Sequence, residues 1–568
     1  ETPEEMFRRV AKNIASAERF YKSGQNTKKL EEDFFLVMAN MEFLPNSPTL
    51  MNAGRRLQQL SACFVLPVED CLDSIFDAVK ESALIHQSGG GTGFSFSRLR
   101  PKDDVVKSTG GAASGPVSFM QVFNTTTDVI RQGGTRRGAN MGILRIDHPD
   151  IEEFICAKDN PQKFTNFNLS VAVTDEFMKV LESNADYSVI NPRTGNIVCY
   201  KNAKEVFNLI ALSAWKGGEP GIIFIDRMNR ANPTPHIGLF EATNPCGEQP
   251  LLPYESCNLG SINLARMLKK SDRRHQTSDL RLQSTAYSLQ SELYEIDWEK
   301  LEKTVKLGIR FLDNVIDVNK YPLPQIEKVT KGNRKIGLGV MGFADMLIKM
   351  RTAYDSRGAL NIAEDIMSFI NKTAWDESCE IAKQKGAFPN LNGSIFDKPD
   401  AKPVRNATTT TIAPTGTLSI IAGCSSGIEP VFSLNYTRQV LDGLELPEIY
   451  PLLNEVAIEE GFYSKGLMEY VASGKSIAER QDVPSHIKRI FVTAYQISPQ
   501  WHIKIEASFQ RHTDNAVSKT INMPKSASHD DVRDAYLLAY KLGCKGITIY
   551  RSGTRPKQVL TCKDTLYC

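Results

Sequence analysis

The chain has 568 residues, which at about 150 residues per domain gives a prior of three to four domains, although one barrel can be as long as several domains. Hydrophobic residues make up 41% and charged residues 24%, a globular composition that excludes disordered and fibrous classes. Lys and Arg together number 68 against 66 Asp and Glu, so the net charge of +2 creates no overall field for nucleic acid or an anionic membrane. We therefore expect no nucleic-acid and no membrane partner.

No apolar stretch approaches the roughly 18 residues of a membrane-spanning helix. The longest are 221–225, which is short, and 336–347, which contains Asp345. No basic and apolar leader opens the chain, although it begins at Glu1 and the sequence leaves a removed N-terminus open. We expect a soluble, cytoplasmic protein.

The eleven cysteines do not form a disulfide or zinc pattern. Their number is odd, and no Cys-x-x-Cys pair or His-x(3–5)-His spacing is present. No metal site is therefore predicted. Each Cys has to be judged by its neighbours, since a buried Cys is most often a small hydrophobic residue.

In chain order, residues 1 to about 45 are predicted to be helical because Phe7, Val10, Ile14 and Ala17 follow helical spacing. Beyond Ser61, short β-rich runs alternate with helical stretches, a pattern that favours an α/β architecture. The runs are 63–66, 141–146, 221–225 and 408–412, and the helical stretches include 72–87 and 361–383. The polar stretch 269–295 is interpreted as a mobile insertion or surface helix, and the residues after Tyr550 as a basic, irregular tail.

Three Gly-rich segments are candidate anion sites. Residues 87–93 precede Arg98 and Arg100, residues 131–138 combine glycines with three arginines, and residues 413–419 follow a predicted strand. From local sequence alone, a structural turn explains the first two equally well, and an ordinary helix N-cap explains the third better.

The segment 244–248, Asn-Pro-Cys-Gly-Glu, has the most chemistry. Its prolines and glycine prevent a helix, so we expect Asn244, Cys246 and Glu248 on alternate positions of an extended loop, facing one side. A nearby carboxylate raises the pKa of a thiol, and no His lies within this segment. Cys246 is therefore better suited to hydrogen-atom transfer than to nucleophilic attack.

Residues 244–251, Asn-Pro-Cys-Gly-Glu-Gln-Pro-Leu, followed by Cys-Asn-Leu-Gly-Ser-Ile-Asn-Leu at 257–264, resemble the active-site loop of ribonucleotide reductases. The Gln-Pro-Leu form resembles that of the adenosylcobalamin-dependent class II enzymes. Further segments resemble the family in its own order, so that the similarity spans about residues 40 to 560: 46–50, 61–63, 89–94, 509–519 and 545–551.

The resemblance implies a ten-stranded α/β barrel of the ribonucleotide reductase type, with a central finger loop carrying the radical Cys and an N-terminal helical region. The domains expected are a helical region at 1–45, the barrel at 46–555 and a tail at 556–568 whose end is expected to be incomplete. Within the barrel, specificity-site helices and loops are expected at about 70–140, the finger loop at about 244–257 and the polar insertion at about 269–295.

By the same resemblance, Cys246 becomes a thiyl radical that abstracts the 3′-hydrogen of a ribonucleotide. Glu248 is the general base on the 3′-hydroxyl, and Asn244 holds the ribose hydroxyls. Cys63 and Cys257 match the pair that delivers two electrons and closes to a disulfide, which requires Cα atoms within about 7 Å.

The resemblance also implies binding sites for the substrate and for a deoxynucleotide or ATP effector. Substrate binding is assigned to a phosphate turn, a hydroxyl and a backbone group near the ribose: Pro414, Thr415, Gly416, Thr417 and Leu418, with Ser47 and Ala62. Asp70 and Arg100 match effector-binding residues, and the loop 133–140 with Arg136 matches the segment that links effector identity to the choice of base.

The cofactor implied is adenosylcobalamin, and the partners implied are a thioredoxin-like or other dithiol reductant and a second copy in a homodimer. No Tyr-Tyr pair of the class I radical route occurs, which favours class II; a class I large subunit is the alternative. Only Cys562 and Cys568 lie in the tail, where the family carries Cys pairs that re-reduce the active site. The sequence leaves diphosphate against triphosphate substrates open, with diphosphates expected.

Overall fold

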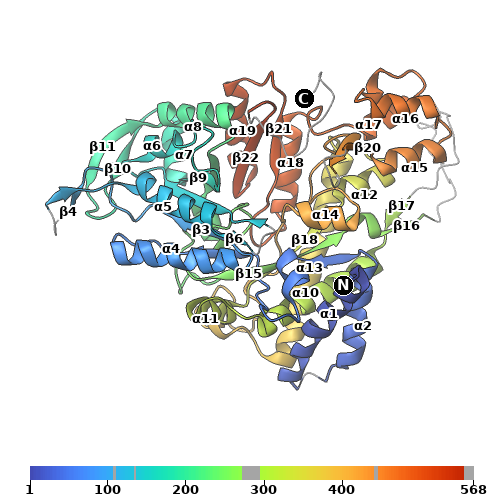
Figure 1. Ribbon diagram of the computed structural model, residues 1–568, viewed down its shortest axis with the longest axis horizontal. Helices are drawn as coiled ribbons and strands as arrows, with labels where there is room; N and C mark the ends of the chain where they lie inside the picture. The colour runs from blue at the N-terminus through green and yellow to red at the C-terminus, as the bar shows by residue number, and fades with distance from the viewer. Residues whose placement is uncertain (23, 107–109, 133–135, 272–293, 440–444, 555–568) are drawn as a thin grey trace.

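Five parallel strands from the first half of the chain form one side of the central sheet in the computed structural model (Figure 1). In sheet order they are β2 (Cys63–Leu66), β3 (Gly91–Ser95), β8 (Asn140–Arg145), β9 (Phe167–Val173) and β12 (Gly221–Phe224). Parallel neighbours need crossover connections, and helices α4 (Leu72–Gln87), α5 (Pro116–Val129) and α8 (Ala203–Gly217) lie in those connections. The structure describes residues 1–568 except 23, 107–109, 133–135, 272–293, 440–444 and 555–568.

Five further segments complete the ring and confirm the predicted barrel. They are β15 (Ser256–Asn263), β18 (Ile336–Met341), the extended segment 408–412, β21 (Thr520–Met523) and β22 (Gly546–Arg551). They run parallel to one another, through the ladders β15–β18 and β21–β22, the bridge Leu338–Thr410, and the bridge from Ile412 to Val517, three residues before β21. The two sets of five meet antiparallel at β2–β15 and at β12–β22.

The segment 408–412 was predicted as a strand but forms isolated bridges rather than a continuous ladder. The side chain of Asp514 takes two of its backbone donors, because one carboxylate oxygen accepts from the N–H of Thr409 at 2.8 Å and of Thr410 at 3.1 Å. The Asp514 side chain thus takes the place of a neighbouring strand at Thr409 and Thr410. Backbone hydrogen bonds still join the segment to residues 515–516, since the N–H of Asn515 donates to the carbonyl of Thr410 and the N–H of Ile412 to that of Ala516.

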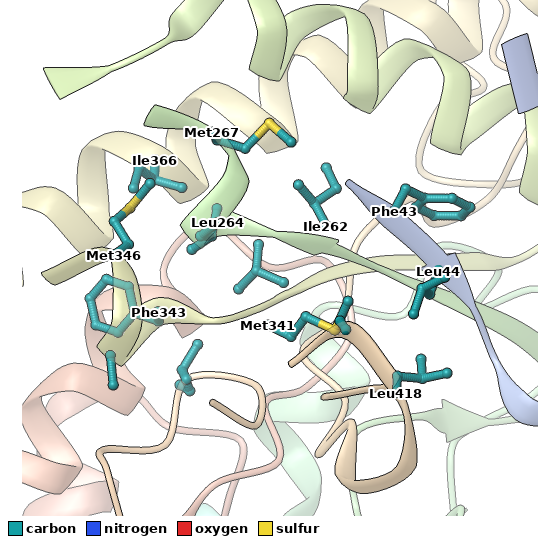
Figure 2. Packing of buried hydrophobic residues seen from close by; sticks show 14 of the residues in the cluster. Phe43, Leu44, Ile262, Leu264, Met267, Met341, Phe343, Met346, Ile366 and Leu418 are labelled. Carbon is teal, nitrogen blue, oxygen red and sulfur yellow. The ribbon is translucent and has the colours of Figure 1, made fainter. Parts of the chain in front are cut away.

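The N-terminal region is helical, as predicted, with α1 (Pro3–Ala15) and α2 (Thr27–Ala39). The prediction to about residue 45 is wrong at its end, because β1 (Phe43–Pro45) pairs antiparallel with β15 beyond the part of β15 that pairs with β2. The apolar faces of these elements pack on the barrel, and Figure 2 shows Phe43 and Leu44 beside Ile262 in this cluster. The cluster ties the first forty-odd residues to the second set of strands.

The remaining elements surround the barrel. Figure 1 shows α4, α5 and α8 on the side of the first five strands, and α10 (Trp298–Val318) and α13 (Arg357–Lys385) beside the N-terminal helices. The other helices of eight residues or more in the described ranges are α7 (Asp175–Glu182), α11 (Pro324–Asn333), α15 (Pro451–Glu459), α16 (Lys465–Ala472), α18 (Pro499–Gln510) and α19 (His529–Leu542). Shorter ones are α3 (Ser47–Asn52), α6 (Ile151–Ile155), α9 (Ile225–Arg230), α12 (Phe343–Lys349), α14 (Gly416–Ala422) and α17 (Ser485–Ile490).

Small antiparallel pairs decorate this framework. They are β4 (Val105–Val106) with β5 (Gly111–Ala112), β6 (Arg131–Gln132) with β7 (Arg136–Arg137), β10 (Asp186–Ile190) with β11 (Ile197–Asn202), β16 (Leu268–Lys270) with β17 (Tyr294–Ile296), and β19 (Asn435–Gln439) with β20 (Glu445–Ile449). The β16–β17 pair joins the two ends of the predicted polar insertion, most of which, 272–293, lies outside the described residues.

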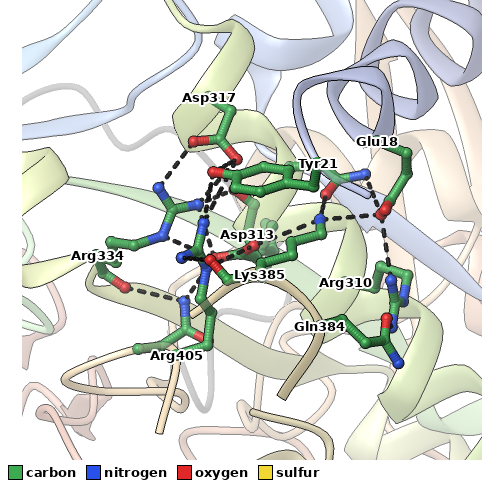
Figure 3. Close-up of polar contacts among 12 residues, drawn as sticks. Glu18, Tyr21, Arg310, Asp313, Asp317, Arg334, Gln384, Lys385 and Arg405 are labelled. Carbon is green, nitrogen blue, oxygen red and sulfur yellow. Dashed lines mark hydrogen bonds and ion pairs between the residues drawn. The ribbon is translucent and has the colours of Figure 1, made fainter. Parts of the chain in front are cut away.

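A buried ionic network joins the N-terminal region to the barrel (Figure 3). The carboxylate of Glu18, 3% exposed, accepts from Arg310 at 3.2 Å and pairs with Lys385 at 2.9 Å. The hydroxyl of Tyr21 donates to Asp317 at 3.0 Å and accepts from Arg405 at 2.6 Å. Charges from α10, α13 and the segment before 408 therefore hold the turn that follows α1.

Among the helices in the described part of the chain, none combines the length and the apolar character needed to cross a membrane.

Candidate functional site

A short hairpin carries the segment 244–248 inside the barrel. Its two strands are β13 (Ala242–Thr243) and β14 (Pro250–Leu251), and the N–H of Gly247 donates to the carbonyl of Asn244 at 3.0 Å to close the turn. Gly247 has φ of +82°, a left-handed value that favours glycine. The segment is thus a tight turn rather than the extended loop that we predicted, and Cys246 is at its exposed tip.

The turn separates the three predicted side chains. Asn244 and Glu248 are each 2% exposed and lie below the tip, whereas Cys246 is open to the solvent side. The Asn244 side chain also folds back within the hairpin, since its oxygen accepts from the N–H of Gln249 at 3.0 Å. The exposed thiol of Cys246 and the buried side chains of Asn244 and Glu248 can therefore contact a bound ligand at different places.

Glycines in the barrel wall make room for the hairpin. A Cβ on Gly93 of β3 would lie 1.8 Å from the carbonyl oxygen of Thr243, and one on Gly91 would lie 2.9 Å from Pro245. Across the barrel, a Cβ on Gly337 of β18 would lie 2.7 Å from the amide of Gln249. Only glycine at these positions allows the hairpin to run this close to both walls.

Hydrogen bonds from β9, from the segment 408–412 and from Ala516 hold the tip in place. The side chain of Asn168 on β9 donates to the carbonyl of Pro245 at 2.7 Å. The carbonyl of Glu248 accepts from the hydroxyl of Thr411 and from the N–H of Ala516, both at 2.9 Å. The wall therefore fixes the backbone on each side of Cys246.

Cys63 and Cys257 face one another across the antiparallel seam. They are paired residues of β2 and β15, and Cα atoms of such pairs lie about 4.5–5.5 Å apart, within the range that a disulfide requires. Both are thiols, 3% and 0% exposed, and Asn244 donates its side-chain N–H to the Cys63 sulfur at 3.1 Å. The structure thus brings four of the five predicted catalytic residues together, with Cys246 at the tip of the same hairpin.

Burial dominates the electrostatics of these groups. Desolvation raises the pKa of Glu248 to about 7, and its Oε2 is buried with no hydrogen-bond partner among the described residues. The pKa of the Cys63 thiol is raised well above its usual value by burial and by Glu248, and that of Cys257 is raised by burial. Both thiols are therefore protonated near neutrality, while Glu248 can gain or lose a proton there.

The turn 414–418 has the geometry of an anion site. Ser419 is the first residue whose N–H bonds back into the turn, so the N–H groups of Gly416, Thr417 and Leu418 lie at the start of α14 without an α-helical partner. Thr415 holds a left-handed φ of +53°, and its hydroxyl accepts from the N–H of Gly427 at 2.7 Å. Gly416 and Thr417 are exposed, so a ligand can reach them.

Hydrophobic packing connects this turn to the redox pair. Ala413, just before the turn, belongs to the same buried cluster as Cys63 and Cys257. Leu418 packs in the cluster that contains Leu44 (Figure 2), and Ser47 is three residues beyond Leu44, at the start of α3. The phosphate turn and Ser47 therefore border the same side of the barrel.

Ala62, the last predicted substrate residue, is half-buried directly before Cys63. Its N–H donates to the carbonyl of Cys257 at 3.3 Å, and its carbonyl accepts from Gly91 at 2.9 Å. Both backbone groups already bond within the barrel, which leaves the second lone pair of the carbonyl for a ligand.

The predicted effector residues Asp70 and Arg100 contact one another directly. The Asp70 carboxylate accepts from Nε of Arg100 at 2.9 and 3.0 Å and from its backbone N–H at 3.0 Å. Arg136 lies on β7, whose backbone pairs with β6, and its side chain lies outside what the structure describes. The tail cysteines, Cys562 and Cys568, also lie outside the described residues.

Several site residues were missed from the sequence. Asn168 and Thr411 anchor the hairpin, and the fully buried pair Lys335 and Glu255, 3.1 Å apart, lies beside Cys257. The Thr-rich run 408–412 was noted only as a strand, and nothing local distinguishes Lys335 from a surface lysine. Their roles depend on contacts between distant segments, which no local pattern encodes.

A barrel that encloses a thiol-bearing hairpin over a cross-strand Cys pair defines a narrow class of protein. The protein-family model described as "Ribonucleotide reductase, barrel domain" matches residues 61–550 of the chain, and the model described as "Ribonucleotide reductase, all-alpha domain" matches residues 1–58. The chain belongs to the ribonucleotide reductase family.

Relatives in curated collections agree with this membership. The chain is 53% identical over 540 residues to a vitamin B12-dependent ribonucleoside-diphosphate reductase of Thermoplasma acidophilum, covering 95% of this chain and 67% of the relative. It is 45% identical over 562 residues to a protein of the same name from Mycobacterium tuberculosis, covering 99% of this chain and 77% of the relative. The chain thus spans about two thirds to three quarters of the length of these two relatives.

A solved structure matches the fold over nearly the whole length. The class Id ribonucleotide reductase alpha subunit of Actinobacillus ureae superposes with a TM-score of 0.75 at 23% identity, covering 97% of this chain and 94% of that chain. At that identity the match supports the fold alone.

Proposed function

We propose that this chain reduces ribonucleoside diphosphates to 2′-deoxyribonucleotides by thiyl-radical chemistry with adenosylcobalamin. The observation that carries the proposal is the hairpin tip, which holds Cys246 above Asn244, Glu248 and the facing thiols of Cys63 and Cys257. The names of the two relatives, both vitamin B12-dependent ribonucleoside-diphosphate reductases, support the cofactor and the diphosphate substrate.

The residues at the tip fit an external radical source. Cys246 is exposed, and a Cβ on the adjacent Gly247 would meet nothing within 4 Å, so a bulky group can approach the thiol. When bound, adenosylcobalamin supplies an organic radical by homolysis of its cobalt–carbon bond. Tyr550 on β22 has Arg551 as its neighbour rather than a second Tyr, which favours this class II route over a class I route.

In the proposed reaction, Cys246 as a thiyl radical removes the 3′-hydrogen of the ribose and returns it at the end. Asn244 and Glu248 contact the ribose hydroxyls, and Glu248 accepts the 3′-hydroxyl proton as the 2′-hydroxyl leaves as water. The raised pKa of Glu248, about 7, suits a group that takes and gives a proton near neutrality.

Cys63 and Cys257 supply the reducing equivalents. Two electrons and two protons pass from the thiols to the substrate, so that one C–O bond becomes a C–H bond, one water is released and one disulfide forms. An external dithiol, of the thioredoxin type, then restores the thiols by exchange. In the native chain, Cys562 and Cys568 are candidates to relay this step.

The substrate phosphates are assigned to Pro414, Thr415, Gly416, Thr417 and Leu418, with Ser47 and Ala62 beside the ribose. Support comes from the N–H groups at the start of α14, which have no intrahelical partner in the described part of the chain, and from the place of Ala413 in the redox cluster. The deoxynucleotide or ATP effector is assigned to Asp70, Arg100 and Arg136, which couple effector identity to base choice.

We propose that the chain forms a homodimer and that the exposed face of α4, next to this effector site, is the interface. Leu72, Phe76 and Leu84 on α4 are 62%, 51% and 41% exposed, an apolar stripe of the kind that protein partners cover. Since Asp70 is two residues before the start of this helix, pairing through α4 would place the effector site at the subunit boundary.

Anaerobic incubation with a ribonucleoside diphosphate, adenosylcobalamin and dithiothreitol tests the function. We expect deoxynucleotide without any second protein, and none from a Cys246→Ala variant that still binds nucleotide. A strict need for an iron- or manganese-containing partner would instead assign the chain to class I, and product formed by Cys246→Ala would refute the radical role of Cys246.

A further inference from the structure

The two redox sulfurs differ in the charged groups around them, although burial and Glu248 raise the pKa of both thiols. Cys257 lies beside Lys335, whose side chain is 1% exposed and whose ammonium pairs with Glu255 at 3.1 Å. That carboxylate also accepts from the N–H of Leu252 at 2.9 Å and from the side chain of Asn333 at 2.6 Å, so its charge is shared among three donors. Among the charged groups that act on the Cys257 sulfur, Lys335 has the largest effect and lowers the pKa of the thiol, while Glu255 and Glu248 each raise it by less.

Lys335 is fixed in this position. Its ammonium donates to the carbonyl of Pro250 at 3.0 Å and lies over the ring of Phe240 at 4.4 Å. The Cys257 thiol in turn points at backbone acceptors, the carbonyls of Asn258 at 3.4 Å and Lys335 at 3.6 Å. A sulfur released here as an anion meets a buried cation, and after protonation it meets two acceptors.

Acidic groups dominate among the charges that act on Cys63. Glu248, Cys257 and Cys246 all raise the pKa of the Cys63 thiol, and the side-chain N–H of Asn244, a neutral donor 3.1 Å from the sulfur, lowers it. Cys63 also lies on the side of the hairpin residues Asn244 and Glu248, which contact the substrate in the proposed reaction. An incoming thiol that enters after product release therefore reaches Cys63 first, with Cys257 behind it, 0% exposed.

We propose that re-reduction of the Cys63–Cys257 disulfide is directional: the reductant's thiolate bonds to Sγ of Cys63, and Cys257 leaves toward Lys335. This inference rests on the redox role given to the pair under the proposed function. In the first step one S–S bond breaks and a mixed disulfide with Cys63 forms, while Cys257 carries away the electron pair. In the second, the other thiol of the dithiol displaces Cys63, which takes a proton, and the oxidised dithiol departs.

Exchange chemistry favours this direction, because the sulfur that is more stable as a thiolate leaves faster and attack is restricted to the accessible sulfur. Lys335 acts through Cys257 and does not touch the substrate, so it is a positioning residue. Its removal is expected to change which sulfur leaves, whereas a purely structural lysine would affect stability alone.

The native chain tests the direction without any substitution. The protein is oxidised with diamide, peptide mapping confirms the Cys63–Cys257 bond, and a large excess of 2-mercaptoethanol is added briefly before acid quenching and alkylation. Mass spectrometry then locates the adduct. We expect mercaptoethanol on Cys63 and the alkyl group on Cys257 in about nine of ten trapped molecules.

Mercaptoethanol mainly on Cys257, or equally on both, would overturn the inference and leave the proposed function standing. If diamide forms no bond between Cys63 and Cys257 in folded protein, the redox pair itself is wrong and both proposals fail. The experiment requires no turnover, so a missing cofactor cannot obscure it.

Substitution of the lysine provides the second measurement. In Lys335→Met we expect the share of adduct on Cys63 to fall toward about half and the re-reduction rate to drop about tenfold, with both restored in Lys335→Arg. Lys385→Met is the matched control, because Lys385 is equally buried but pairs with Glu18 near the N-terminal helices. An unchanged adduct distribution in folded Lys335→Met would remove Lys335 from the inference.

Discussion

Glu248 shows how burial of one side chain sets its pKa and therefore the chemistry it can perform. Its carboxyl is 2% exposed, and desolvation raises its pKa to about 7 against the smaller, opposite effect of the Asn244 side chain. Asp70, also next to a predicted ligand site, has Arg100 on its carboxylate instead. The first can exchange a proton near neutrality, whereas the second is held as a partner for a cationic side chain.

The pH dependence of kcat/KM should report this carboxyl. As a base, Glu248 must be ionised in the free enzyme, so kcat/KM should fall about tenfold per pH unit below about 7 and level off above it. Glu248→Gln should lose at least about 100-fold in rate and lack this limb. A limb near the ordinary value of a glutamate would show that Glu248 is not the titrating base.

At the scale of elements, the hairpin and the wall are matched through glycine. The sequence identified β2, β8, β12 and α4 within a residue or so, because apolar runs and helical periodicity are local. It could not show that Gly93 and Gly337 serve the hairpin, since that depends on the backbone of a segment far away in the chain.

Substituting Gly93 by Ala tests this fit. The new Cβ would lie 1.8 Å from the carbonyl oxygen of Thr243, so β13 must move, and a shift of about 1 Å at the tip should lower kcat about 100-fold. Gly217→Ala in α8 is the control, because its Cβ would meet nothing closer than 4.0 Å. Full activity in folded Gly93→Ala would show that the hairpin tolerates displacement.

The segment 408–412 depends on one side chain. Asp514 accepts from the N–H groups of Thr409 and Thr410 through one oxygen, and from Asn371 at 2.9 Å and Trp375 at 3.2 Å through the other. Asp514→Ala leaves these donors without partners and should lower the free energy of unfolding by about 3 kcal/mol.

Turnover should fall together with stability in Asp514→Ala, because Thr411 of the same segment holds the carbonyl of Glu248. Chemical denaturation and a turnover assay measure the two effects, and Asp514→Asn, which keeps an acceptor, should lie between the parent and the Ala variant. A loss of stability with unchanged turnover would separate the segment from the active site.

At the scale of the molecule, the sequence established the family and the barrel, and the interpretation as class II came from the same motifs. The sequence did not reveal that a network of buried ion pairs joins the N-terminal region to the barrel. Glu18, Arg310 and Lys385 lie in three separate helical stretches with no shared pattern. Their positions follow from packing of whole elements, which a single sequence does not display.

Glu18→Gln should loosen this junction. The change leaves Arg310 and Lys385 buried with less compensation, so the free energy of unfolding should fall by about 3 kcal/mol, measured by denaturation. Glu299→Gln, which removes an exposed partner of Lys303, should have little effect. Equal effects of the two substitutions would show that the buried network adds no stability of its own.

The seam between β2 and β15 connects the redox state of the active site to the stability of the fold. Cys63 and Cys257 belong to opposite halves of the barrel. In the proposed reaction each turnover therefore forms a disulfide that links the two halves, and each re-reduction breaks it. A cross-link that closes a loop of this length should stabilise the fold by about 5 kcal/mol through the unfolded chain. Heat resistance would then rise and fall with the catalytic cycle, and a melting curve could read the redox state of the enzyme.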